Sequence, residues 1–212
     1  MKMKVTKYPQ SHLIIITDSG KKLIIDPGYF TYQSNFKVSD FQGADCYLIT
    51  HQHPDHLDPE TIKEVVGDKP VYGNADVVAK LYEVGVKGTE VRDREDFTID
   101  GVKITPIDLP HFTKLGVEMP QNTGFLIDGV FFHPGDGDKA PDELESEKLA
   151  LPIGGATITL DTALQFTKDI KAKMVIPIHY DYYKADPEEF KKMAEAFGIE
   201  VRPLAPGAET TI

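Results

Sequence analysis

The 212-residue sequence contains a single cysteine, Cys46. One thiol cannot form an internal disulfide, so a disulfide-stabilised scaffold is excluded. Cys46 lies in an apolar run, where a free cysteine is more often an inert core residue than a nucleophile. Reactive groups are therefore expected among other residue types.

Long apolar segments are also absent from the sequence. No run approaches the roughly 20 residues that span a membrane. Residues 1–5 lead directly into strand-like sequence, without the apolar segment of a signal peptide. We therefore expect a cytoplasmic protein without a membrane partner.

Positive charge is scarce relative to negative charge. The chain has 23 Lys and Arg residues against 34 Asp and Glu residues, a formal net charge of -11. Polyanionic partners require basic surface, so we expect no nucleic-acid partner and favour a small-molecule substrate. A local basic pocket remains compatible with this charge, and bound divalent cations would offset part of it. The composition leaves homo-oligomerisation open.

The sequence has the composition of an ordinary folded domain, with 41% hydrophobic and 27% charged residues. We find no linker or low-complexity segment, so residues 1–212 are predicted to form one domain. Apolar runs and alternation predict strands at 4–8, 12–17, 22–25, 45–50, 71–72, 90–99, 102–109, 123–128, 130–133, 149–153 and 174–178. Helical periodicity predicts helices at 60–66, 75–84, 160–170 and 186–197, with loops at 29–44 and 112–122. The tail at 200–212 leaves one more edge strand open.

The stretch from His51 to His56 carries the strongest chemical signal, the pattern H-x-H-x-D-H. Neutral imidazole and carboxylate are ligands that divalent metals such as zinc prefer. In an extended segment His51 and His53 point the same way, whereas Asp55 and His56 are adjacent and diverge. The motif therefore favours two neighbouring metals, with a polar, His-rich loop as the alternative.

Further candidate ligands follow apolar strands elsewhere in the chain. His111, Asp136 and His179 each come just after a predicted strand, in a turn-rich segment. If these strands pack in one core, their ends converge at one rim. Taken singly, each histidine is more often structural or solvated, and Asp136 alone suits a turn.

Three other residues lie close to these candidates in the sequence. Asp26, in the turn Ile25-Asp26-Pro27-Gly28, is either a turn residue or an acceptor for the ring N–H of a metal-bound histidine. His133 precedes Asp136 by three residues, and Tyr180 follows His179 directly. Each is predicted either to support a ligand or to have a purely structural role.

The candidate ligands also resemble those of a known family. Order and spacing resemble the metallo-β-lactamase superfamily in four segments: the motif at 51–56, His111, Gly135-Asp136 and Pro177-Ile178-His179. The segments 122–125, 132–136, 151–155 and 176–180 further resemble the branch of small stand-alone hydrolases that includes ascorbate-phosphate lactonase.

The resemblance implies an α/β fold of four layers, an αββα sandwich with a dinuclear metal site at one edge of its two sheets. It implies that one metal is held by His51, His53 and His111. It implies that the second is held by Asp55, His56 and His179, with Asp136 as the bridge. Zinc is the first expectation for the two divalent ions, and manganese and iron suit the same ligands.

Such a site predicts a hydrolase in which a hydroxide activated by two metals attacks a small ester, lactone or phosphoester. Asp55 is the candidate catalytic residue that orients this hydroxide and accepts its proton. Two alternatives remain: a phosphodiesterase or nuclease acting on nucleic acid, and a metal-binding protein without hydrolytic activity. The charge disfavours the first of these, and the second class normally has a fused flavin domain.

Overall fold

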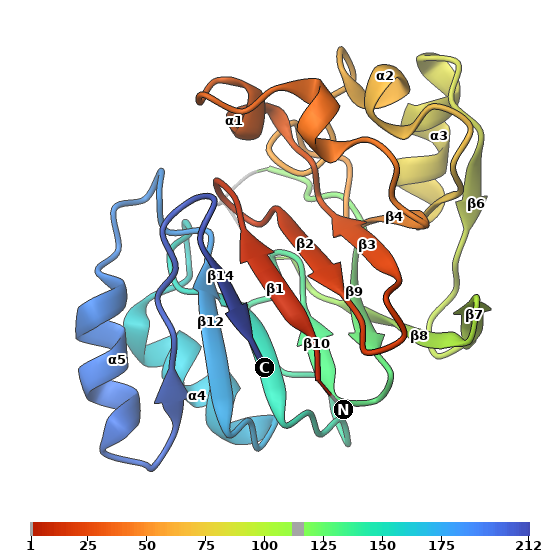
Figure 1. Ribbon diagram of the computed structural model, residues 1–212. Coiled ribbons are helices and arrows are strands. Elements are labelled where there is room, and N and C mark those ends of the chain that lie inside the picture. The colour runs from red at the N-terminus through yellow and green to blue at the C-terminus, as the bar shows by residue number, and fades with distance from the viewer. Residues whose placement is uncertain (1, 112–116) are drawn as a thin grey trace.

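The computed structural model describes residues 2–111 and 117–212, so residues 112–116 of the predicted polar loop lie outside the described part. Two mixed β-sheets lie face to face at its centre (Figure 1). Within the described residues each sheet has seven strands, in the orders β14-β1-β2-β3-β4-β5-β6 and β13-β12-β11-β10-β9-β8-β7. In each sheet four neighbouring strands are antiparallel, and the strands beyond them continue in parallel.

The strand bounds follow the apolar segments of the sequence. The first sheet consists of β14 (Glu209–Thr211), β1 (Lys4–Lys7), β2 (Leu13–Ile16), β3 (Lys22–Ile25), β4 (Cys46–Ile49), β5 (Val71–Gly73) and β6 (Gly88–Glu90). The second sheet consists of β13 (Glu200–Val201), β12 (Met174–Ile178), β11 (Lys148–Pro152), β10 (Phe131–His133), β9 (Asn122–Ile127), β8 (Val102–Leu109) and β7 (Phe97–Ile99).

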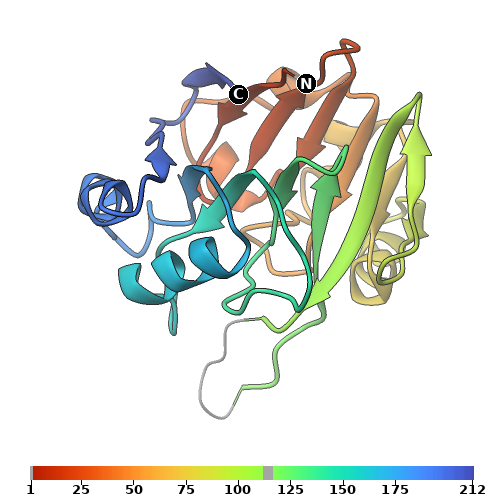
Figure 2. The same ribbon diagram turned by 90° about the horizontal axis from the view of Figure 1, so that it is seen from below.

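Helices cover the outer face of each sheet (Figures 1 and 2). Those beside the first sheet are α1 (Tyr29–Tyr32), the 3₁₀ helix η1 (Val38–Phe41), α2 (Ile62–Val66) and α3 (Ala75–Glu83). Those beside the second sheet are α4 (Leu160–Asp169) and α5 (Pro187–Glu195). No helix in the described ranges combines the length and the apolar character needed to cross a membrane.

Three apolar layers hold these elements together. The central layer joins the two sheets and includes Leu48 of β4 and Phe125 of β9. The outer layers join each sheet to its helices, through Tyr47 and Leu81 on one side and Phe166 on the other. Strands such as β4 are buried on both faces, which explains their continuous apolar sequence. The predicted αββα sandwich is confirmed.

Several predicted boundaries differ from the structure. The segment 90–99 is not one strand: β6 ends the first sheet, and β7 begins the second. The backbone turns between them, where Arg94 has a φ of 57°. The predicted loop 29–44 contains α1 and η1, and α2 begins only at Ile62 because Asp58 caps a preceding turn through the Thr61 hydroxyl. The tail supplies one edge strand to each sheet.

The fold brings four strand ends to one edge of the sandwich. β4 ends just before His51 in the first sheet, and β8, β10 and β12 end just before His111, Asp136 and His179 in the second. A hydrogen bond from the Thr123 amide to the Thr50 carbonyl, 2.9 Å long, ties the two sheets together at this edge. The predicted convergence of strand ends is thereby confirmed for the backbone.

Candidate metal centre

The His51–His56 loop leaves β4 and turns at once. The amides of His56 and Leu57 both donate to the His53 carbonyl, at 2.9 and 2.8 Å. The segment is therefore a tight turn, and the extended conformation assumed from the sequence is wrong. Even so, the turn places the side chains of His51 and His53 together, with Nε2 and Nδ1 3.1 Å apart.

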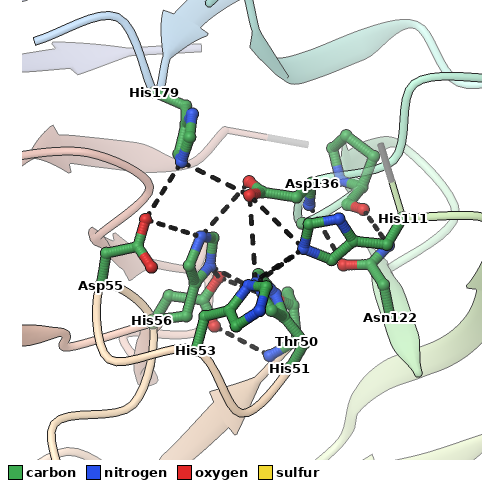
Figure 3. A network of polar contacts seen from close by, with 12 residues as sticks. Thr50, His51, His53, Asp55, His56, His111, Asn122, Asp136 and His179 are labelled. Atoms are coloured by element: carbon green, nitrogen blue, oxygen red, sulfur yellow. Dashed lines mark hydrogen bonds and ion pairs between the residues drawn. The ribbon is translucent and has the colours of Figure 1, made fainter. Parts of the chain in front are cut away.

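Three imidazoles form the first group of candidate ligands. Nε2 of His111 lies 3.2 Å from Nε2 of His51 and 3.2 Å from Nδ1 of His53. With the 3.1 Å separation of His51 and His53, the three nitrogens form a nearly equilateral triangle. Figure 3 shows these three ring edges facing one another. Nitrogen lone pairs that face a common point repel one another unless a proton or a metal ion lies between them.

Two histidines and two carboxylates form the second group. Nε2 of His179 lies 3.2 Å from Oδ2 of Asp55, and Nε2 of His56 lies 3.2 Å from Oδ1 of Asp136. One candidate ligand atom from each of the four residues lies within 4.8 Å of the other three.

Asp136 joins the two groups. Its Oδ2 lies 3.4 Å from Nε2 of His179 on one side. On the other side it lies 3.7 Å from Nε2 of His111 and 3.9 Å from Nε2 of His51. Dashed lines in Figure 3 lead from this carboxylate to both groups. Asp136 thus has the position that a bridging ligand requires.

The donor set fits divalent metal ions. Tetrahedral coordination with bonds of about 2.0–2.1 Å separates ligand nitrogens by about 3.3–3.4 Å, close to the edges of the imidazole triangle. Nε2 of His56 and Oδ1 of Asp136 are buried and, apart from their 3.2 Å ion-pair contact with each other, have no hydrogen-bond partner among the described residues. Buried polar atoms normally have a partner, and a metal ion would supply one here.

Hydrogen bonds at Nδ1, the ring nitrogen that points away from the ligand groups, orient two of the histidines. Asp26, fully buried, accepts a hydrogen bond of 2.7 Å from Nδ1–H of His56 and another of 2.7 Å from the Thr50 hydroxyl. The Thr50 oxygen lies 3.1 Å from Nδ1 of His51 and can accept its N–H. When the rings are neutral, these contacts leave a lone pair on Nε2 of both, facing the ligand groups. The structure therefore places Asp26 where the sequence analysis expected an acceptor.

His179 is fixed by its own backbone and by the loop after β11. Its φ of 56° is left-handed, and its amide donates to the Gln10 carbonyl at 3.1 Å. Its Nδ1 donates to the Gly154 carbonyl at 2.8 Å, which turns Nε2 toward Asp55 and Asp136.

Charges within the groups shift the protonation of the candidate ligands. Burial, together with the nearby imidazoles, holds the pKa of His51 well below its usual value, so that ring is neutral. Burial opposes ionisation of Asp136, yet His179 and His56 more than offset it and hold the pKa of that carboxyl below its usual range. Burial likewise opposes the charge on His56, yet Asp136, Asp26 and Asp55 raise its pKa. The group of Asp55, His56, Asp136 and His179 therefore favours a bound positive charge, either a proton or a metal ion.

Two predicted supporting residues lie farther from the ligands. His133 is buried, with Nε2 2.9 Å from the Ser11 carbonyl, and its Nδ1 accepts from the Gly135 amide at 3.2 Å. It supports the turn that carries Asp136. Tyr180 donates to the Leu204 carbonyl at 2.9 Å and lies under the ammonium group of Lys7. Tyr180 therefore packs against the C-terminal segment, which matches the structural role given as the alternative.

The sequence analysis missed three residues of this site. Thr50 connects Asp26 to His51, as described above. Asn122 accepts a hydrogen bond from the Asp136 amide at 3.1 Å and donates to the Pro134 carbonyl at 3.0 Å. Tyr183 places its ring 5.3 Å from that of His179. Their only sequence signal is proximity to a ligand or a strand end, which many residues share.

Cavities flank the two groups on either side. One of about 310 Å³ is lined by Phe30, Asp181 and Tyr182 among others, close to His179 in the sequence. Another of about 360 Å³ includes His53 together with Asp76 and Glu118. A cavity of about 450 Å³ includes His111 and Asn122. These volumes are in the range of small-molecule sites.

Comparison with known proteins agrees with this architecture. Residues 4–179 match the model of the β-lactamase superfamily domain. The chain is 33% identical to a metal-dependent hydrolase of Pyrococcus abyssi, over 93% of this chain and 95% of that protein.

Solved structures show the same fold. Igni18, a metallo hydrolase from Ignicoccus hospitalis, superposes with a TM-score of 0.83 and 26% identity, covering 100% of this chain and 99% of that one. The metallo-β-lactamase fold protein YhfI of Bacillus subtilis superposes with a TM-score of 0.71 at 17% identity, covering 100% and 99%. With its match over residues 4–179, its relatives and its αββα architecture, the chain belongs to the metallo-β-lactamase superfamily.

Proposed function

We propose that this protein is a hydrolase that uses two divalent metal ions, zinc in the first instance, to cleave a small ester, lactone or phosphoester. The position of Asp136 carries the proposal, because its Oδ2 lies between the imidazole triangle and the group of Asp55, His56 and His179. The relative from Pyrococcus abyssi, named a metal-dependent hydrolase, supports the same reaction class.

His51, His53 and His111 would hold one ion, and Asp55, His56 and His179 the other, with Asp136 shared. Bound there, two divalent ions supply Lewis acidity, which activates water and stabilises negative charge on the substrate oxygen.

Asp55 is more open to solvent than the shared carboxylate of Asp136. Its side chain is 23% exposed, whereas that of Asp136 is 2% exposed. Burial raises the pKa of Asp55, but His56 and the hydrogen bond from His179 outweigh this and hold it below the usual range. The carboxylate therefore stays ionised at neutral pH, accepts a hydrogen bond from an entering water and orients it. A strongly depressed pKa makes Asp55 better suited to orientation than to permanent proton uptake.

A small-molecule substrate is favoured over nucleic acid. The flanking cavities have volumes of about 310, 360 and 450 Å³. Among the described residues that line these cavities none is Lys or Arg, whereas a nucleic-acid channel needs cations along the phosphate backbone.

Metal analysis combined with a substrate screen tests the proposal. Purified protein is analysed for bound metals, then assayed on p-nitrophenyl phosphodiesters, lactones, thioesters and single-stranded DNA, with and without chelator. We expect two metals per chain and chelator-sensitive cleavage of a small substrate. Less than one metal per chain, or activity indifferent to chelator, would overturn the mechanism, and preferential cleavage of DNA would overturn the substrate class.

A matched pair of variants tests the ligand assignment. Asp136→Asn removes a bridging carboxylate, so occupancy should fall to one metal or none, and kcat/KM should fall by more than the roughly 10- to 100-fold typical of partners outside the ligand set. Asp138→Asn is the control, because Asp138 lies in the same turn and its Oδ2 accepts a hydrogen bond from Thr157. Equal metal loss in both variants would show that the turn, and not the carboxylate, matters.

A further inference from the structure

The cavity of about 310 Å³ is lined by Gln10, Phe30, Gln33, Ser34, Asp181 and Tyr182, together with two prolines. It lies where the turn after β1, the α1 segment and the loop after β12 meet. None of these residues is a candidate metal ligand.

Both walls of this cavity are tied to candidate ligands. On one side, Gln10 accepts the hydrogen bond that fixes the His179 amide, and Asp181 and Tyr182 follow His179 directly. On the other side, the amide of Tyr29, next to Phe30, donates to the Pro54 carbonyl at 2.8 Å. Pro54 precedes Asp55. The cavity therefore adjoins the group of Asp55 and His179.

Exposed aromatic side chains gather at the same place. Tyr29, Tyr182 and Tyr183 are 43%, 63% and 41% exposed, and they are half of the large apolar side chains that are exposed in the described ranges. The rings of Phe30 and Tyr182 lie 5.6 Å apart, and those of Tyr182 and Tyr183 lie 5.3 Å apart. Clustered exposed aromatics beside a cavity are typical of a ligand site.

The charges of the cavity wall cancel. Asp181 is the only charged residue among the described residues of the lining, and its Oδ2 pairs with Nζ of Lys7 at 2.9 Å. The same oxygen accepts the Gln10 amide at 2.8 Å. An anionic group in the cavity would face the carboxylate of Asp181 and no lysine or arginine among the described lining residues. A cationic group would face the same carboxylate, which is already paired with Lys7. The wall thus favours an uncharged occupant.

One hydrogen-bond donor of the wall lacks a partner. The side-chain oxygen of Gln10 accepts from the Tyr182 amide at 3.2 Å, which fixes the orientation of the carboxamide. Its Nε2 is buried and has no partner among the described residues. An unpaired buried donor costs free energy, but this nitrogen has almost no accessible surface, so the aromatic rings and not this donor define the occupant.

We propose that this cavity, lined by the contacting rings of Phe30 and Tyr182, is the subsite for an uncharged aromatic substituent of the substrate. The volume of about 310 Å³ is about twice that of a 150 Å³ cavity that holds benzene, so it accommodates a ring with a short connecting chain. The inference rests on the proposed function for the identity of the reacting group, because the bond to be cleaved would lie at Asp55 and His179. The binding step itself requires no turnover.

Equilibrium binding of an uncharged naphthyl amide tests the subsite. The chain contains no tryptophan, so the fluorescence of 2-naphthylacetamide is measured without indole emission. The titration uses metal-loaded protein, and a second titration uses the same amide with a sulfonate on the ring. We expect saturable binding of the neutral amide and binding of the sulfonate weaker by about tenfold.

Variants of the two walls locate the binding. Phe30→Ala and Tyr182→Ala should each weaken binding of the neutral amide by about tenfold, because each removes a stacking face. Phe30→Leu retains apolar volume and should lose less. Tyr82→Ala is the matched control, since Tyr82 is a tyrosine on α3 with 84% exposure. Metal content and thermal unfolding of each variant are measured to exclude misfolding.

The outcomes separate this inference from the proposed hydrolysis. Equal affinity in wild type, Phe30→Ala and Tyr182→Ala would overturn the subsite, and so would tighter binding of the sulfonate that depends on the same two rings. Hydrolysis of small esters with no effect of these variants would refute the subsite alone. Binding that depends on both rings, in a protein that hydrolyses none of the tested esters, lactones or phosphoesters, would refute the proposed function alone.

Discussion

Asp26→Asn is the substitution that best tests how the metal centre is oriented. Asp26 has no exposed surface and accepts three hydrogen bonds. Its Oδ1 accepts from the Thr50 amide at 2.8 Å, and its Oδ2 accepts from the Thr50 hydroxyl and from Nδ1–H of His56, both at 2.7 Å. The backbone φ of Asp26 is 51°, a left-handed conformation that asparagine also tolerates. The substitution therefore changes hydrogen bonding with little change in backbone strain.

An asparagine cannot accept all three hydrogen bonds. If its oxygen keeps the Thr50 amide, its NH₂ group faces both the Thr50 hydroxyl and Nδ1 of His56. His56 must then accept at Nδ1 and carry its proton on Nε2, the atom that lies 3.2 Å from Asp136. The lone pair needed for a metal is lost from this ring, whereas His53 and His111 keep theirs. We expect affinity for the second metal to fall by about 10- to 100-fold, or about 1.4–2.8 kcal/mol.

Calorimetric titration of metal-free protein with Zn²⁺ resolves the two sites, and the visible absorption of bound Co²⁺ reports their geometry. Asp45→Asn is the control, because Asp45 also accepts a backbone hydrogen bond, from Lys22 at 2.8 Å. In Asp26→Asn we expect the affinity for the second metal, the one that His56 would hold, to fall. The affinity for the first metal should stay within threefold of the wild-type value. Equal weakening of both steps, or no shift relative to Asp45→Asn, would refute the role assigned to Asp26.

Two further predictions concern stability. In Gly28→Ala the new Cβ would lie 1.9 Å from the Asp55 carbonyl oxygen, so urea denaturation should show a loss of about 1–3 kcal/mol together with loss of the second metal. Gly129→Ala, with open space around its Cβ and a φ of 69°, should cost only about 1 kcal/mol of backbone strain and keep both metals, and equal metal loss in the two would refute the steric account. Burial lowers the pKa of His12 from 6.5 to about 3. The unfolded chain then binds this proton more readily, so stability is complete above pH 6.5 and falls as the pH drops toward 3, by about 2 kcal/mol at pH 5. Urea denaturation of metal-free His12→Phe should show a smaller loss between pH 7.5 and 5 than wild type, and an unchanged slope would exclude His12 as the cause.

The sequence pointed to the candidate ligands because each lies in a turn-rich segment after a buried strand. Such strands are short apolar runs, and polar or turn-forming residues begin where they end, as where His179 follows Ile178. The residues that orient the ligands gave no comparable signal. Thr50 and Asn122 act through the backbone or through neighbouring hydrogen bonds, and nothing in their residue type distinguishes them from other polar residues at strand ends.

Two features that residue patterns do not reveal have a shared physical origin in backbone direction. Tyr180 follows a ligand directly, yet the left-handed backbone of His179 sends Tyr180 toward Leu204 and brings Tyr183 beside the ligand instead. Segment 90–99 alternates like one strand, yet the turn at Arg94 divides it between two sheets. Residue patterns specify burial, whereas these changes of direction depend on tertiary contacts that a single sequence does not display.

The ligand groups draw on both sheets, and this has a thermodynamic consequence. His51, His53, Asp55 and His56 come from the end of β4 in the first sheet, whereas the remaining ligands come from the second. The sheets are held together by the central apolar layer and, at this edge, by the hydrogen bond from Thr123 to Thr50. Each ion bound by ligands of both sheets would add a cross-link that the unfolded chain lacks. Metal binding and the packing of the two sheets are therefore coupled, and each stabilises the other.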